Sequence, residues 1–279
     1  MNPSVQLQIG NETAYLYLDL LKRCLANFIY QDPAIPMPPE ENEVFDPETR
    51  RRGRDRPSQA HTMIGLNRLE NIQALVEDVL RNGVPGDLIE TGVARGGATI
   101  FMRGILKAYG VADRKVWVAD SFGKFPRSAE SGLTRRSYTS PYWAEITTVL
   151  NRYPEQFERM MTSVNARTSY EEVREHFGRY GLLDDQVEFL VGWFCDTLPS
   201  ASIESLALLR IDADLYDSTY EPLTRLYPRL SDGGHVIVDD YHSFPECKAA
   251  VDDYLREHGL TVRLQVVDEA VHWRKSPGG

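Results

Sequence analysis

Leu206 to Asp214 reads LALLRIDAD and Val236 to Asp240 reads VIVDD, so two apolar runs each stop in aspartates. Strands of a parallel α/β sheet are buried on both faces and therefore read as continuous apolar runs. Ligands bind beyond the carboxyl ends of such strands. The two stretches predict neighbouring strands that place four carboxylates at one edge of a parallel sheet.

Four unneutralised carboxylates at one edge repel one another, which makes a bound divalent cation a natural partner. The alternative is that these aspartates cap helices or contact solvent, as a single strand-end aspartate commonly does. Two acidic strand ends on the same edge favour the cation site.

The rest of the chain alternates between strand and helix patterns. Strands are predicted over 87–91, 116–119, 187–191, 206–211 and 235–238, and helices over 12–30, 66–82, 98–109, 168–177, 219–230 and 245–258. Two final strands, 261–267 and 270–273, are close enough to form a terminal hairpin. The pattern predicts a Rossmann-like α/β fold whose mostly parallel sheet has an antiparallel edge.

Two regions fall outside this alternation. Residues 1–61 are expected to form an N-terminal helix and a mobile arm before the main domain, residues 62–279. The apolar helix 12–30 packs either on a partner subunit, giving a homo-oligomer, or on its own domain. The arginine run 50–56 is expected to be a solvated, mobile loop, and the alternative is that it meets an anionic group. The irregular residues 124–166 are interpreted as a lid insertion.

Composition narrows the class of protein. Hydrophobic residues make up 42% and charged residues 26% of 279 residues, as in soluble globular proteins. The net charge of -10 argues against nucleic-acid or membrane partners. Three scattered cysteines, and no pattern of a signal peptide or membrane span, lead us to expect a cytoplasmic protein.

A glycine-rich turn follows the first predicted strand, as Glu90-x-Gly92-x-x-x-Gly96-Gly97. Glycines let the backbone approach a ligand closely, and the less favoured alternative is a tight strand-to-helix turn without a ligand. The spacing matches neither a dinucleotide nor a triphosphate motif. Asp120 ends the second strand, where a carboxylate can bind both ribose hydroxyls. Asp196, just past the third strand, either meets an adenine amino group or caps the turn at Thr197.

Together these residues resemble class I S-adenosylmethionine-dependent methyltransferases, and most closely the macrocin O-methyltransferase family. Members of this family methylate sugar hydroxyls in macrolide and aminocoumarin antibiotic pathways. The resemblance covers most of the chain and is carried by residues 61–65, 88–93, 191–194, 210–216, 236–241 and 272–275.

The resemblance implies a role for individual residues. A divalent metal, usually Mg²⁺, is expected on Asp212, Asp239 and Asp240, and Asp214 corresponds to the family's proposed general base. The positions that match the S-adenosylmethionine site are Met63, Glu90, Gly92, Asp120, Ser121 and Asp196. The acceptor implied is a glycosylated small molecule.

Physical chemistry supports this assignment without deciding every role. Mg²⁺ takes oxygen ligands and keeps open positions, which two sugar hydroxyls could fill. Asp214 shares a strand face with Asp212 if the strand stays regular, but Asp217 and His242 also compete as bases. Asp217 is expected instead to cap the helix near Thr219, and His242 to be an ordinary loop histidine.

Several contacts and two other functions stay open. His61 is a candidate for cofactor or acceptor contact, and Tyr216 and Trp193 line either a pocket or the core. A catechol- or phenol-type O-methyltransferase would use a divalent metal in the same way. A non-catalytic S-adenosylmethionine-binding protein would bind the nucleoside without transferring a methyl group.

Overall fold

The computed structural model describes residues 11–35, 44–123 and 168–278. Its centre is a seven-stranded sheet in the order β3-β2-β1-β4-β5-β7-β6. The strands are β1 (Asp87–Thr91), β2 (Val116–Asp120), β3 (Val187–Val191), β4 (Leu206–Ile211), β5 (Leu230–Val238), β6 (Gln265–Val267) and β7 (Ala270–Arg274). The first five run parallel, and the hairpin of β6 and β7 pairs antiparallel with β5, which confirms the predicted sheet.

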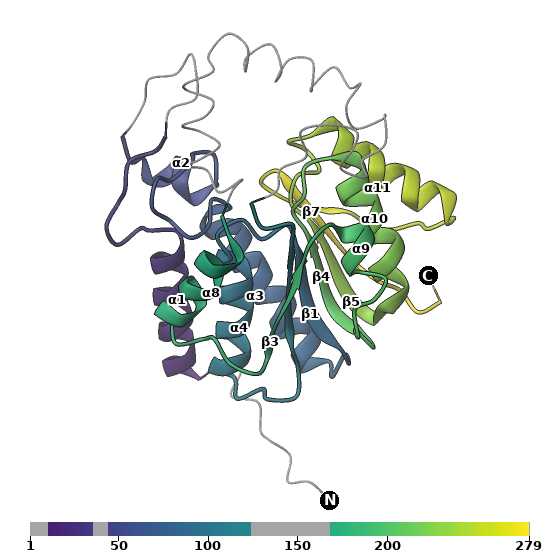
Figure 1. The fold of residues 1–279 in the computed structure, drawn as a ribbon, viewed down its shortest axis with the longest axis horizontal. Helices are drawn as coiled ribbons and strands as arrows, with labels where there is room; N and C mark the ends of the chain where they lie inside the picture. The colour runs from purple at the N-terminus through teal and green to yellow at the C-terminus, as the bar shows by residue number, and fades with distance from the viewer. Residues whose placement is uncertain (1–10, 36–43, 124–167, 279) are drawn as a thin grey trace, which may run out of the picture.

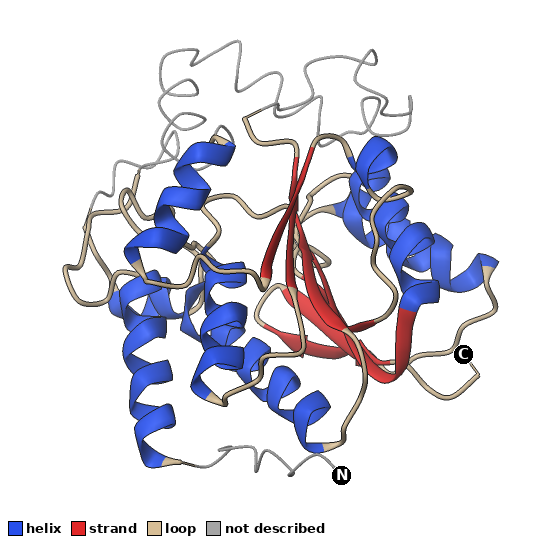
Figure 2. Ribbon diagram, turned by 60° about the horizontal axis from the view of Figure 1, so that its bottom comes forward, coloured by secondary structure: helices blue, strands red, loops and turns tan. Residues whose placement is uncertain are grey.

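Helices cover both faces of the sheet (Figures 1 and 2). On one side lie α1 (Glu12–Leu25), α3 (Gly65–Arg81), α4 (Gly97–Ala108) and α8 (Tyr170–Arg179), and on the other α9 (Phe194–Thr197), α10 (Tyr216–Leu226) and α11 (Pro245–Glu257). The short α2 (Pro47–Arg51) precedes α3, and a 3-10 turn (Tyr227–Arg229) follows α10. No helix in the described ranges is both long and apolar enough to cross a bilayer.

Alternation along the strands divides the apolar residues between two cores. Leu88 and Leu208 face the side of α1, α3, α4 and α8, whereas Ile89 and Leu209 face α10 and α11. Successive side chains of a strand point to opposite faces, and here both faces are covered. This two-sided burial is the physical basis of the continuous apolar runs in the sequence.

Several element boundaries differ from the predictions. Helix α1 begins at Glu12, as predicted, with Asn11 as its N-cap, but it ends at Leu25 rather than at residue 30. Helix α10 begins at Tyr216, three residues early, so Asp217 lies within its first turn instead of capping it. Strand β5 begins at Leu230 rather than at residue 235. The predicted lid insertion, 124–166, lies outside the described residues.

The expectation of a solvated arginine loop is wrong for Arg50. Its side chain is fully buried and forms ion pairs with Asp32 and Asp55, both at 2.7 Å. It also donates to the carbonyl oxygens of Ala26 and Asp32. A buried guanidinium requires such partners because an unpaired buried charge is very costly. Arg50 therefore ties α2 to the chain that follows α1.

Helix α1 packs on its own domain, which is one of the two alternatives expected for it. Leu18 and Leu25 are fully buried in the core shared with α3 and α4. Tyr15, Leu16 and Leu20 are exposed on its other face. Self-association through this face stays a prediction, which the mass of the protein in solution would check.

Candidate active site

The carboxyl ends of four neighbouring strands, β2, β1, β4 and β5, are aligned by backbone hydrogen bonds that continue beyond the strands. The Asp212 N–H donates to the Thr91 carbonyl, and the Asp239 N–H donates to the Ile211 carbonyl, each at 2.9 Å. The Gly92 N–H donates to the Ala119 carbonyl at 2.8 Å. The glycine turn and both acidic strand ends therefore lie side by side at one edge, as predicted.

Gly92 is required by this alignment. Its φ of 86° is in the left-handed region, and a Cβ atom there would lie 1.8 Å from the Asp212 carbonyl oxygen. No side chain fits in that space. Gly92 thus has a structural reason to be glycine, and its contact joins the turn to the first acidic strand end.

Asp212, Asp239 and Asp240 come together at this edge, and we call them the acidic cluster. One carboxylate oxygen from each lies within 4.8 Å of the others. Asp239 and Asp240 are buried, whereas the side chain of Asp212 is 25% exposed. The set offers only oxygen donors, which suits a hard divalent cation such as Mg²⁺.

Asp214 lies beside the cluster for a reason other than strand periodicity. Strand β4 ends at Ile211, and Asp214 adopts a left-handed φ of 61° in the turn before α10. Its backbone N–H donates to Asp240 Oδ2 at 3.3 Å. Of the competing candidates, Asp217 is in the first turn of α10 and the His242 side chain is exposed.

Two arginines, Arg210 and Arg68, neutralise part of this charge. Arg210 is fully buried on β4, where it contacts Glu90, donates to Asp212 Oδ2 at 2.8 Å and donates to Asp239 Oδ1 at 2.5 Å. Arg68 from α3 binds the other oxygen of Asp239. Sequence reasoning missed both, although an arginine inside the apolar run 206–211 signals buried carboxylate partners.

Burial and mutual repulsion raise the pKa values of several carboxyl groups at this site. Burial raises the pKa of Glu90 to about 8, although Arg210 opposes this shift. Burial, together with the neighbouring Asp212 charge, raises the pKa of Asp214 to about 7. The pKa of Asp240 also lies above its usual range, because the group is buried and the charges of Asp214, Asp212 and Asp239 surround it. A cation would relieve this repulsion.

Asp120 stabilises the backbone of the glycine turn. Its carboxylate accepts hydrogen bonds from the backbone N–H groups of Val93 and Phe122, both at 2.8 Å. The Ser121 hydroxyl lies 3.5 Å from the same carboxylate. Asp120 is thus next to the glycine turn, where the nucleoside is expected to bind. Both of its carboxylate oxygens already accept hydrogen bonds from backbone N–H groups.

Met63 and His61 belong to a segment that packs against the same turn. A Cβ at Gly97 would lie 2.4 Å from the His61 carbonyl oxygen, so residues 61–63 lie against the start of α4. Met63 is half-buried there. His61 Nδ1 lies 2.8 Å from the Tyr180 hydroxyl, and its ring packs on His176. These contacts account for His61 within the fold.

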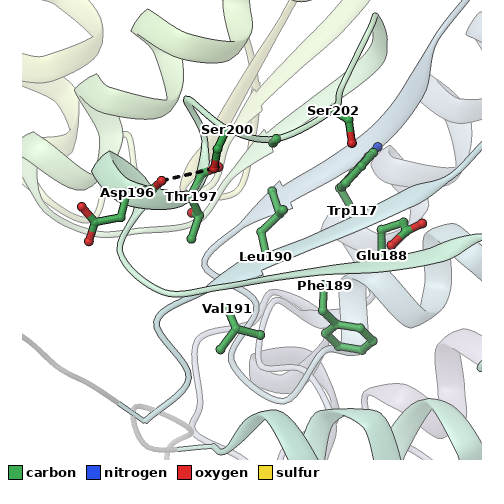
Figure 3. A pocket seen from close by; sticks show the side chains of 10 residues that line it. Trp117, Glu188, Phe189, Leu190, Val191, Asp196, Thr197, Ser200 and Ser202 are labelled. Atoms are coloured by element: carbon green, nitrogen blue, oxygen red, sulfur yellow. Dashed lines mark hydrogen bonds between the residues drawn. The ribbon is translucent and has the colours of Figure 1, made fainter.

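Asp196 is exposed in α9 and lies apart from the acidic cluster. It lines a cavity of about 350 Å³ between β3 and the 196–202 segment (Figure 3). Leu190 and Thr197 are among the other lining residues, and none belongs to the acidic cluster. Tyr216, an alternative pocket residue, donates its hydroxyl to Asp253 at 2.9 Å.

Comparisons with known proteins identify the family of this chain. The macrocin-O-methyltransferase (TylF) family model matches residues 14–275. The chain is 50% identical over 262 residues to mycinamicin III 3''-O-methyltransferase of Micromonospora griseorubida, covering 94% of this chain and 96% of that protein. It is 47% identical over 261 residues to 8-demethyl-8-(2,3-dimethoxy-alpha-L-rhamnosyl)-tetracenomycin-C 4'-O-methyltransferase of Streptomyces olivaceus, covering 93% and 92%.

A solved structure shares the fold. The O-methyltransferase NovP has a TM-score of 0.79 and 48% sequence identity, covering 94% of this chain and 99% of that chain. The family resemblance in the sequence is thereby confirmed. The chain belongs to the macrocin-O-methyltransferase family and is an O-methyltransferase.

Proposed function

We propose that this enzyme transfers the methyl group of S-adenosylmethionine to a sugar hydroxyl of a glycosylated natural product, with a divalent cation such as Mg²⁺. The observation that carries the proposal is the acidic cluster beside the glycine turn. The acceptor class is supported by the relatives, whose names specify mycinamicin III and a rhamnosyl tetracenomycin as acceptors.

In this proposal Asp212, Asp239 and Asp240 hold the cation. When bound, the cation would lower the pKa of an acceptor hydroxyl and fix its position. Asp214 then accepts the hydroxyl proton, because it lies against Asp240 in the turn before α10. The acceptor oxygen forms a bond to the methyl carbon as the bond from that carbon to sulfur breaks, leaving S-adenosylhomocysteine.

The methyl donor is proposed to lie along the glycine turn, on Met63, Glu90, Gly92, Asp120, Ser121 and Asp196. Within the described part of the chain, the buried Glu90 Oε2 has no hydrogen-bond partner. A buried polar oxygen normally has one, so this atom supports a role in binding the donor.

The cation requirement is tested by methyl transfer to a panel of glycosylated acceptors. Chelation should abolish transfer and added Mg²⁺ should restore it, whereas full activity in excess chelator would refute the cation role. Asp212→Asn should weaken Mg²⁺ binding by about tenfold or more while S-adenosylmethionine affinity, measured by titration calorimetry, stays within about twofold.

The proton acceptor is tested separately by comparing Asp214→Asn with Asp217→Asn. Loss of a general base costs about 10²-fold to 10⁴-fold in kcat, so Asp214→Asn should lose activity at that scale and Asp217→Asn should retain it. Retained activity of Asp214→Asn would favour a phenolic acceptor, because a phenol has a lower pKa and needs less help from a base.

A further inference from the structure

Arg68 is held at three points by groups from different parts of the chain. Its side chain is almost buried, with Nε donating to the Ile64 carbonyl at 2.9 Å and Nη2 donating to the Gly53 carbonyl at 3.1 Å. Nη1 donates to Asp239 Oδ2. The guanidinium is a planar fork with donors in fixed directions, so these contacts define one position for it.

Two glycines bring the backbone of the 44–64 segment close enough for this arrangement. Gly53 has a φ of 61°, and a Cβ there would lie 2.4 Å from Arg68 Nη2. Gly65 has a φ of 75°, and a Cβ there would lie 2.4 Å from the Arg51 carbonyl oxygen. The end of α2 and the start of α3 therefore meet backbone to backbone, with Arg68 filling the junction.

Asp239 is held from both sides. Arg68 binds Oδ2, while Arg210 from β4 donates to Oδ1 at 2.5 Å. The carboxylate cannot rotate without breaking one of these bonds. An ionised carboxylate has about four lone-pair sites, so two remain for a cation.

We propose that Arg68 is a positioning residue that couples cation binding at Asp239 to the order of residues 50–58. The inference rests on the proposed function, because it takes the acidic cluster as the cation site. Coupling between two sites is reciprocal, so a cation that restrains Asp239 also restrains Arg68 and, through it, the Gly53 backbone.

The test uses Mg²⁺ alone, with titration calorimetry for affinity and hydrogen exchange for the order of residues 50–58. In the wild-type protein, Mg²⁺ should slow exchange in this segment. Arg68→Lys keeps the charge but loses the fork, so Mg²⁺ should bind about tenfold more weakly and the slowing should disappear. Arg52→Lys, in an exposed pair with Glu48, is the matched control and should behave as wild type.

A second variant, Gly53→Ala, disrupts the same contact because its added Cβ would lie 2.4 Å from Arg68 Nη2. This variant tests the coupling if Arg68→Lys does not fold. It should also lose the Mg²⁺-dependent slowing. Wild-type slowing and affinity within about twofold in the folded variants would overturn the coupling while leaving the cation site intact. Slowing that is absent from the wild-type protein despite Mg²⁺ binding would overturn it too. Failure of the wild-type protein to bind Mg²⁺ would instead overturn the proposed function, and the coupling with it.

Discussion

Among the glycines in the described ranges, Gly92 would place an added Cβ closest to another atom. Gly92→Ala should destabilise the protein by more than about 2 kcal/mol, because a left-handed backbone and a clash with the Asp212 carbonyl add together. Gly110→Ala is the control, since Gly110 has a φ of 69° but open space around its Cβ position, and it should cost about 1 kcal/mol. Urea unfolding measures both, and equal costs would contradict the close approach.

His61 makes stability depend on pH. Burial, followed by the charges of His176 and Arg95, lowers the pKa of His61 from 6.5 to about 4. Between these values the unfolded chain binds a proton that the folded chain does not. The resulting stability is therefore complete above pH 6.5 and is lost as the pH falls towards 4.

The loss from His61 amounts to about 3 kcal/mol. His61→Gln should flatten the curve of unfolding free energy against pH in this window. His242→Gln, at an exposed histidine, should leave the slope as in the wild-type protein. The measurement is urea unfolding at a series of pH values, and an unchanged slope in His61→Gln would rule out this contribution.

At the scale of elements, the framework was predictable and its junctions were not. The N-cap of α8 is Ser169, which forms a capping box with Glu172, and both of its reciprocal hydrogen bonds are present. Helix α10 carries no comparable signal, since Leu215 is its N-cap and the preceding turn is set by Asp214 against Asp240. Local capping chemistry can be read from neighbouring residues, whereas a start determined by a tertiary contact cannot.

The junction of α2 with the chain after α1 depends on Arg50. Arg50→Met should cost about 3–5 kcal/mol, because it leaves Asp32 and Asp55 as buried charges without their partner. Arg52→Met removes an exposed pair with Glu48 in the same helical turn and should cost at most about 1 kcal/mol. Chemical unfolding distinguishes the two, and similar losses would show that Arg50 is not a structural centre.

For the whole molecule, α1 and the sheet share one core. Leu18 is fully buried in that core, so Leu18→Ala should cost about 2–5 kcal/mol. Leu16, 61% exposed on the same helix, provides the control, and Leu16→Ala should change stability by less than about 0.5 kcal/mol.

The same pair of variants tests whether residues 1–61 form a separate unit. In a single cooperative fold, Leu18→Ala shifts the unfolding midpoint of the helical circular dichroism signal and of tryptophan fluorescence by the same amount. Two separate transitions would instead support a boundary between residues 61 and 62. Trp117 and Trp273, both buried on the sheet, are suitable reporters.

The sequence by itself determined the parallel sheet and the edge at which its acidic strand ends meet, because strand burial and strand ends can be read from consecutive residues. The choice of Asp212, Asp239 and Asp240 among the carboxylates at that edge came from the family resemblance. Only the tertiary structure decided which charges meet there. Arg68 and Asp239 are 171 positions apart, and Arg210 joins Glu90 across 120 positions. Buried charges must be paired, but a single sequence does not say with which residue, because the partner is chosen by how the elements pack.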